Sequence, residues 1–143
     1  MAAVEELVRG FFSEGVNDAD YDSFEKYIAP DYQWHWGTEK PSSGTGIDAF
    51  RKEIQALVTA FPDMKTEIYD VVANDNRAAV RFKAVATHQG PWGGVEATGK
   101  PVQWCGIVIY REENGKLAEE WSMDDSRGLF EQLGVIPPIP APW

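Results

Sequence analysis

The hydrophobic pattern of this chain changes its period once, and that change limits the folds open to it. Up to Phe61-Pro62-Asp63 the apolar residues recur mainly at helical spacing, apart from a short extended piece at residues 31–36, whereas from Met64 onward they alternate as in strands. Helices are predicted at residues 2–15, 20–28 and 47–61, and strands at 31–36, 64–73, 77–88, 100–111 and 117–125. Helices followed by a meander of long antiparallel strands form an α+β order. We therefore predict an α+β fold in which short helices cover one face of a strongly curved antiparallel sheet.

Turn-forming residues separate these segments and close the domain. Loops are predicted at residues 37–46 and 89–99, and tight turns at 74–76 and 113–115. A short helix after Asp125 would close on Gly134. The last nine residues carry four prolines and are predicted to form an extended arm on the domain or on a neighbouring subunit. We predict one domain over residues 1–136 and a proline-rich tail over 137–143.

Composition narrows the class of protein. A chain of 143 residues that is 43% hydrophobic has enough material for one domain with a sizeable core. Its 13 basic and 23 acidic residues give a formal charge of −10 and an isoelectric point near 4.6. Such a surface repels phosphate backbones, so we expect no nucleic-acid partner.

The remaining compositional features concern compartment and cofactor. The single cysteine, Cys105, excludes an internal disulfide and any multi-cysteine metal site. The first residues, Met-Ala-Ala-Val-Glu-Glu, do not form a secretory signal, and no apolar run has the length needed to cross a bilayer. We expect a cytoplasmic protein that does not interact with membranes.

The strand at residues 117–125 carries the strongest indication of chemistry. In regular alternation one face holds Leu117, Glu119, Trp121, Met123 and Asp125, and the other holds Ala118, Glu120, Ser122 and Asp124. The first face has three large apolar groups and is predicted to look inward, with Asp125 carried inward and Asp124 left in water. A carboxylate in such a place is unfavourable unless it is paired or protonated, so its pKa should be raised. This is the preparation that a general acid or base needs near neutral pH.

Two other interpretations of Asp125 stay open. The first is that Asp125 is the N-cap of the helix that follows, because Asp is a favoured N-cap residue. The second is that a bulge shifts the strand register by one residue, which would exchange the roles of Asp124 and Asp125.

The two histidines and the tryptophans are further candidates for a site. The sequence contains no phosphate loop, dinucleotide fingerprint or nucleophile elbow, and the histidines lack metal-ligand spacing, so no metal is expected. His88 ends the apolar face of its strand as Asp125 ends another, so both side chains could meet at one cavity. His35 lies between Trp34 and Trp36; each histidine could equally be a structural group. Flat aromatic side chains line pockets for planar ligands but also fill cores, and either Gln103 or Trp104 must face inward.

The C-terminal pattern resembles that of a known family. The pattern Glu119-x-Trp121-x-x-x-Asp125-x-x-Gly128-x-x-x-Gln132-Leu133-Gly134 is similar to the C-terminal signature of the SnoaL-like polyketide cyclases, or ester cyclases. Earlier segments that agree are Asp31-Tyr32 with His35, Gly46 with Phe50, Phe61-Pro62-Asp63, Thr87-His88-x-Gly90 and Thr98-Gly99-Lys100. The resemblance runs in order from the first helix to about Pro137.

The resemblance implies a fold, an activity and roles for residues. These proteins belong to the nuclear transport factor 2-like superfamily, whose cone-shaped fold closes helices and a curved sheet around a deep pocket, and which commonly forms homodimers. Family cyclases use an aspartate at the position of Asp125 as general acid/base in an intramolecular aldol condensation without a cofactor. Nearby histidine or amide side chains polarise the carbonyl, which makes His88, His35 and Gln103 candidates for that role. The other predicted substrate-binding residues are Trp34, Trp36, Phe50, Phe82, Trp104, Trp121 and Met123.

The hypothesis from the sequence is therefore a small cofactor-independent enzyme that acts on an apolar or aromatic carbonyl compound. The same pocket would serve a related hydrolase or isomerase that opens an epoxide or lactone or shifts a double bond. The competing hypothesis is a non-catalytic ligand-binding or dimerisation module, which predicts a cavity filled by tryptophans. In that case Asp125 would be an ordinary solvated or salt-bridged carboxylate.

Overall fold

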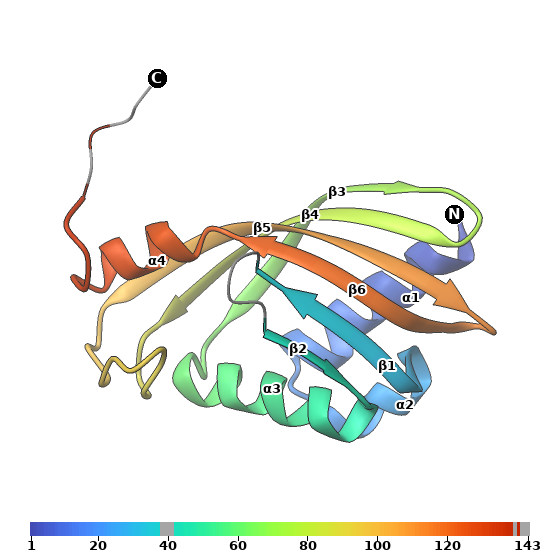
Figure 1. Ribbon diagram of the computed structural model, residues 1–143, viewed down its shortest axis with the longest axis horizontal. Coiled ribbons are helices and arrows are strands. Elements are labelled where there is room, and N and C mark those ends of the chain that lie inside the picture. Colours follow the sequence, from blue (N-terminus) through green and yellow to red (C-terminus); the bar gives the residue numbers. More distant parts are fainter. Residues whose placement is uncertain (38–41, 139, 141–143) are drawn as a thin grey trace.

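A computed structural model describes residues 1–37, 42–138 and 140 of the chain (Figure 1). The helical elements are α1 (Ala3–Gly10), the π-helix η1 (Phe11–Asn17), the 3-10 helix η2 (Tyr21–Ser23), α2 (Phe24–Tyr27), α3 (Ile47–Ala60) and α4 (Ser126–Gln132). The strands are β1 (Ile28–Trp36), β2 (Ser42–Thr45), β3 (Lys65–Ala73), β4 (Arg77–Thr87), β5 (Pro101–Glu113) and β6 (Lys116–Asp124). The predicted change from helices to strands near residue 61 is confirmed. Among the described helices, none is long and apolar enough to cross a membrane.

The six strands form one curved sheet in the order β2-β1-β6-β5-β4-β3. All neighbouring strands are antiparallel except β1 and β6, which pair in parallel. This parallel pair departs from the predicted antiparallel sheet. Figure 1 shows the sheet arching over α1 and α3, with α4 at one end of the sheet after β6. Because the helices pack against the concave face of the sheet, the core and any cavity are expected between that face and the helices.

The first helix differs from the prediction in a way that matters for the core. An α-helix was expected to run from residue 2 to residue 15, but after Gly10 it widens into a π-helix. The consecutive residues Phe11 and Phe12 are both buried, at 2% and 6% exposure. Phe11 packs against Phe24, and Phe12 packs edge-on against Phe82 of β4. The wider turn thus lets one helix place aromatic rings against both the other helices and the sheet.

The segment between the second and third helices contains structure that the sequence analysis did not predict. The loop expected at residues 37–46 includes the edge strand β2, which pairs with β1 from Gln33 to Trp36. Residues 38–41 of that loop, and residues 139 and 141–143 of the predicted tail, lie outside the described part of the chain. Strand β1 also begins three residues earlier than expected, at Ile28.

The face predicted for β4 is confirmed, whereas the one predicted for β6 is wrong. On β4, the side chains of Val80, Phe82, Ala84 and Ala86, followed by His88, are all buried. On β6 a bulge interrupts the pairing with β5, since Arg111 lies opposite Glu119 but Glu112 lies opposite Leu117. Ala118 is the extra residue, and both Leu117 and Ala118 are buried.

The bulge reverses the alternation along the rest of β6. Glu120 and Ser122 are buried on the concave side, at 3% and 9% exposure, while Met123 is 55% exposed. Trp121 lies half-buried on the outer face of the sheet, where the Arg77 guanidinium lies 5.2 Å from the centroid of its ring. Of the three large apolar side chains that predicted an inward face, Leu117 is buried, but Trp121 and Met123 lie on the outer face because they follow the bulge.

Candidate active site

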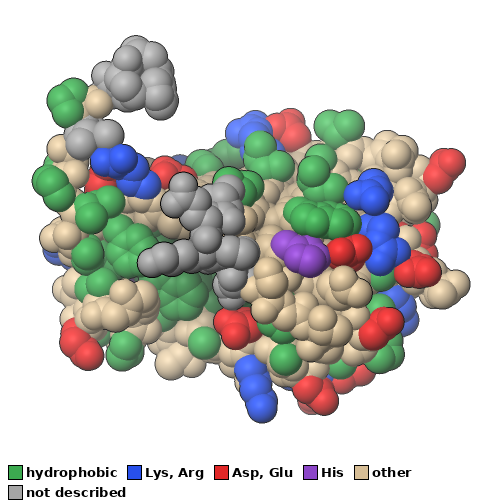
Figure 2. Space-filling view, in the orientation of Figure 1, with side chains coloured by type: hydrophobic (Ala, Val, Ile, Leu, Met, Phe, Trp, Pro, Cys, Tyr) green, Lys and Arg blue, Asp and Glu red, His purple; other side chains and the backbone are tan. Residues whose placement is uncertain are grey.

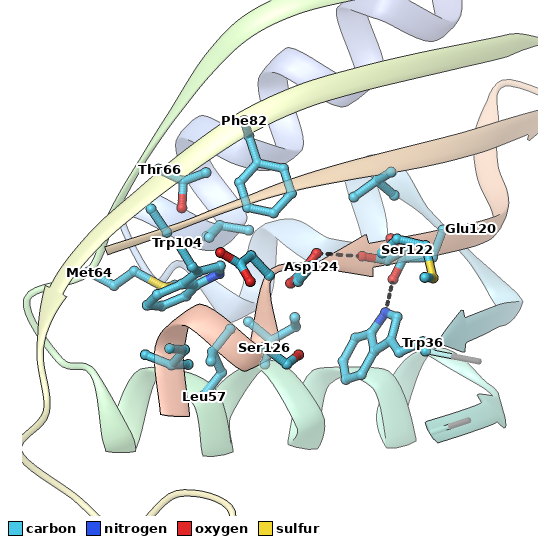
Figure 3. Close-up of a pocket in the computed structure, with 18 of the residues that line it drawn as sticks. Trp36, Leu57, Met64, Thr66, Phe82, Trp104, Glu120, Ser122, Asp124 and Ser126 are labelled. Carbon is cyan, nitrogen blue, oxygen red and sulfur yellow. Dashed lines mark hydrogen bonds between the residues drawn. The ribbon is translucent and has the colours of Figure 1, made fainter. Parts of the chain in front are cut away.

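The concave face of the sheet encloses a cavity of about 430 Å³ between the strands and helices η1, α3 and α4. Most of its wall is aromatic or aliphatic, and its polar side chains are few (Figure 3). The aromatic residues of the wall are Phe11, Phe12, Trp36, Phe50, Phe82, Trp92, Trp104, Tyr110 and Phe130. The ionisable side chains of the wall, besides Tyr110, are Glu120, Asp124 and Asp125, and it includes no Lys, Arg or His of the described residues. A pocket of this size and lining suits a flat, apolar ligand held by a small number of polar groups.

Strand β6 supplies a row of three polar side chains to the cavity. Glu120, Ser122 and Asp124 lie two residues apart, so after the bulge they point to the same side of the strand. Figure 3 shows this row along β6, with Ser122 between the two carboxyl groups. This row is the polar part of the candidate site.

Asp124 is the carboxyl group that lies within the apolar cavity. The Ser122 hydroxyl donates to Asp124 Oδ1 over 2.9 Å, which leaves the other carboxyl oxygen free of that bond. On the neighbouring strand β5, Gly106 is the residue paired with Asp124, and a Cβ there would overlap Asp124 Oδ1. Asp124 remains exposed to solvent. Even so, the protein atoms packed around its carboxyl remove enough water to raise its pKa, against the opposing effect of the Ser122 hydrogen bond.

Asp125 borders the same cavity but its carboxyl has a structural partner. It is the N-cap of α4, and its Oδ1 accepts a hydrogen bond of 2.9 Å from the backbone N–H of Gly128. Its own backbone N–H donates to the carbonyl of Cys105. The capping interpretation of Asp125 thus describes its geometry. The expectation that Asp125 faces inward while Asp124 faces water is wrong, because the bulge at Ala118 exchanges the two positions.

Glu120 lies at the inner end of the row. Its Oε1 accepts a hydrogen bond of 2.8 Å from the indole N–H of Trp36 on β1. Burial raises the pKa of Glu120 to about 7, with a further contribution from the negative charge of Asp124. The groups that act against this rise are Trp36 and the hydroxyls of Tyr32 and Tyr110. The pKa values of both tyrosines are raised well above their ordinary range, first by burial and then by the charge of Glu120.

His35 is not part of the cavity wall, which corrects the expectation that it could be a site residue. Because Tyr32, Trp34 and Trp36 of β1 face inward, His35 between them faces outward. Its Nε2 lies 2.9 Å from Glu119 Oε1, and its ring stacks on Trp121. A histidine visible in Figure 2 lies between an acidic side chain and hydrophobic side chains on this face of the molecule. The parallel pairing of β1 with β6 creates this outer cluster.

His88 is fully buried but also lies outside the cavity wall, so its expected meeting with a β6 aspartate in the cavity does not occur. Its Nδ1 accepts a hydrogen bond of 3.1 Å from the backbone N–H of Thr98 and lies 2.9 Å from the Thr98 hydroxyl. Its ring packs on Phe61. These contacts fasten the two ends of the loop between β4 and β5, because the backbone of His88 also pairs with Gly99 and Lys100. His88 therefore holds the loop that carries Trp92 into the cavity wall.

The predicted substrate-binding residues divide between the two faces of the sheet. Those that line the cavity are Trp36, Phe50, Phe82 and Trp104. Met123 borders the cavity, but its side chain is 55% exposed and lies on the outer face beside Ile107. Gln103 faces outward, and its backbone pairs with the side chain of Gln132 in α4. Trp34 is buried behind the wall, next to Trp36 and Phe50, and Trp121 lies on the outer face. The alternation of faces corrects the expectations for Gln103 and Trp121, whereas Trp34 shares the inward face of Trp36 but is covered by Trp36 and Phe50.

The residues that the sequence analysis missed are Glu120, Ser122, Gly106 and Tyr110. A weak signal for the first two existed, because they share a face with Asp124 and a bulge would turn that face inward. Nothing in the sequence indicated that Gly106 makes room for the Asp124 carboxyl. Within the described residues, no three or more His, Cys, Asp or Glu side chains are arranged to hold a metal ion.

Comparison with known proteins agrees with this architecture. The structure of AclR from Streptomyces galilaeus, a proposed hydroxylase, is 28% identical, with a TM-score of 0.82 over 96% of this chain and 84% of that one. The structure of IdmH from Streptomyces antibioticus, a proposed polyketide cyclase, is 26% identical, with a TM-score of 0.78 over 92% of this chain and 99% of that one. A proposed SnoaL-like polyketide cyclase from Jannaschia sp. CCS1 shares the fold at 19% identity, with a TM-score of 0.85 over 95% and 94% of the two chains. No curated protein matches the chain.

The fold is the cone of the nuclear transport factor 2-like superfamily, with helices and a curved sheet around a deep pocket. Within that fold the chain belongs to the SnoaL-like polyketide cyclase family, whose model matches residues 6–133.

Proposed function

We propose that this protein is an acid/base enzyme that transfers a proton in its aromatic cavity, without a cofactor, on a neutral polyketide-like carbonyl compound. The reaction that fits family membership best is an intramolecular aldol cyclisation. The observation that carries the proposal is the Asp124 carboxyl, which points into an apolar cavity and whose pKa burial raises. A carboxylate held in such surroundings is a stronger base than one in water.

The proposed steps of the reaction start from the hydrogen bond that Ser122 makes to Asp124. Because Ser122 donates to Oδ1 of Asp124, the other oxygen, Oδ2, takes the proton from the carbon next to the substrate carbonyl. The resulting enolate carbon forms the new bond to a second carbonyl carbon of the same molecule. The alkoxide formed there accepts the proton back from Asp124, so the enzyme returns to its starting state. Ser122 keeps the carboxyl oriented throughout the cycle.

The cavity wall supports a neutral, flat substrate. Trp36, Trp92 and Trp104 offer broad aromatic faces, and the acidic side chains of the wall would repel an anion. The non-catalytic alternative predicted a cavity filled by tryptophans, whereas a volume of about 430 Å³ stays open. An isomerase or a hydrolase that opens an epoxide or lactone would use the same Asp124 carboxyl, and substrate screening would separate these reactions.

The test of proton transfer uses 2-tetralone, a neutral bicyclic ketone with acidic protons beside its carbonyl. Exchange of these protons in deuterium oxide is followed by proton NMR with and without the protein. We expect Asp124→Asn to reduce the protein-dependent rate by about 100-fold or more, the usual contribution of a general base. Asp125→Asn is the matched control and should keep most of the rate. Loss of exchange in Asp125→Asn alone would instead support the original assignment of Asp125 as the base.

We also propose that the protein forms a homodimer through the outer face of β5. Ile107 and Ile109 on that face are 51% and 41% exposed, and Met123 of β6 lies beside Ile107. Exposed apolar side chains grouped on one sheet face are typical of protein association surfaces.

A further inference from the structure

Glu120 is a carboxyl group at the inner end of the cavity that has no positively charged partner among the described residues. Its hydrogen-bonding neighbours are all uncharged: the indole N–H of Trp36 donates to Oε1 over 2.8 Å, and the hydroxyls of Tyr32 and Tyr110 also act on its carboxyl. The titratable groups that face it are Tyr32 from β1, Tyr110 from β5 and Asp124 from its own strand, and none of them carries a positive charge. A buried carboxyl in such surroundings is more stable as the neutral acid than as the carboxylate.

The neighbouring Glu119, on the same strand, differs from Glu120 in the partners of its carboxylate. It points to the outer face, where its two oxygens lie 2.9 Å from His35 Nε2 and 3.1 Å from Arg111 Nε. Burial acts to raise the pKa of Glu119, but the hydrogen bonds from His35 and Arg111 outweigh burial and lower it. The protein thus provides the Arg111 guanidinium and the His35 imidazole for the outer glutamate and only neutral donors for the inner one.

The hydrogen bond from Trp36 determines where the proton of neutral Glu120 resides. Because the indole N–H donates to Oε1, the acid proton belongs on Oε2. Glu120 lines the cavity, so a ligand can reach its carboxyl group, beside which the hydroxyls of Tyr32 and Tyr110 lie. A carboxylic acid in an apolar pocket is a strong hydrogen-bond donor to a carbonyl oxygen.

We propose that protonated Glu120 binds the carbonyl oxygen of the ligand and so selects flat, neutral, conjugated ketones. The inference deepens the proposed function, since it rests on the same cavity and names the class of substrate. Glu120 and Asp124 lie four residues apart on one strand, so their Cα atoms are separated by about 13 Å. A ligand of two or three fused rings with more than one carbonyl would therefore contact Glu120 with one carbonyl oxygen and Asp124 with the carbon next to another carbonyl. Conjugation between the two ends would carry the negative charge formed near Asp124 to the oxygen held by Glu120.

The test is a binding experiment that requires no turnover. Calorimetric titrations with 1-tetralone, which has an acceptor oxygen, are compared with tetralin, which has none, at pH 5.5 and pH 8.5. A group with a pKa of about 7 is about 97% protonated at the lower pH and about 3% protonated at the higher. If only the protonated form binds the ketone, the apparent Kd of 1-tetralone rises by up to about 30-fold, and that of tetralin stays unchanged.

Variants assign the effect to one side chain. Glu120→Gln keeps an acceptor for Trp36 and a donor for the ligand, so its 1-tetralone affinity should become independent of pH. Glu119→Gln, on the outer face, should keep the pH dependence of the wild type. Asp124→Asn should keep a pH dependence whose midpoint lies at lower pH, because the charge of Asp124 contributes to the raised pKa of Glu120. The proposal is overturned if 1-tetralone does not bind at pH 5.5, if both ligands show the same pH response, or if Glu120→Gln retains it. None of these results depends on whether Asp124 is the base, so failure of the proposed proton transfer would be seen separately in the exchange assay.

Discussion

Replacing Glu120 by glutamine is expected to stabilise the folded protein at alkaline pH. The substitution changes little in shape and keeps the acceptor for the Trp36 indole. The pKa of Glu120 is raised from its ordinary 4.5 to about 7 by burial. The folded state therefore holds a proton that the unfolded state has already released between these two pH values.

The sign and size of the effect follow from this difference in pKa. Because the folded pKa is the higher one, the contribution of Glu120 is fully favourable below pH 4.5 and is lost as the pH rises through 7. A difference of about 2.5 between the two pKa values corresponds to roughly 3 kcal/mol in the free energy of unfolding. Glu120→Gln should thus match the wild type near pH 4.5 and exceed its stability by roughly 3 kcal/mol at pH 8.5.

Urea unfolding of wild type and variant at a series of pH values measures this difference. Subtracting the two curves removes the contributions of the other titrating groups, including Asp124. The matched control is Glu119→Gln, which should lose stability at pH 8.5 because its carboxylate accepts from Arg111 and contacts His35. A Glu120→Gln protein that is no more stable than wild type at pH 8.5 would refute the argument that this carboxyl is buried without compensation.

Three further predictions concern the surroundings of the site and the proposed dimer surface. Gly106→Ala should lower the 2-tetralone exchange rate by about 10-fold or more, because the added Cβ displaces the Asp124 carboxyl. Cys105→Ala on the outer face is the control. An unchanged rate in Gly106→Ala would show that the space left by the glycine is not needed. Asp125→Ala should lower the free energy of unfolding by about 1 kcal/mol in urea titrations through loss of the α4 cap, and an unchanged stability would contradict the capping role. Ile107→Glu should convert the protein to a monomer in light-scattering measurements, whereas an unaltered mass would exclude the outer face of β5 as the dimer surface.

The order of elements and much of the cavity wall were determined by local sequence. Helical spacing before Phe61 and alternation after it predicted the helices and long strands, because these periodicities depend only on near neighbours. The same alternation correctly buried Phe82 in β4, and helical spacing placed Phe50 on the inner face of α3. A flat aromatic pocket was therefore predictable before its shape was known.

The polar part of the site depended on tertiary structure. The bulge at Ala118 exists only in the pairing of β6 with β5, and it decides that Asp124 rather than Asp125 enters the cavity. The partner of Glu120, Trp36, is distant in sequence and is brought beside it by the parallel pairing of β1 with β6. His35 was separated from the cavity by that same pairing. The sequence of one strand defines two alternating faces, but the register of that strand against its neighbours determines which face is buried.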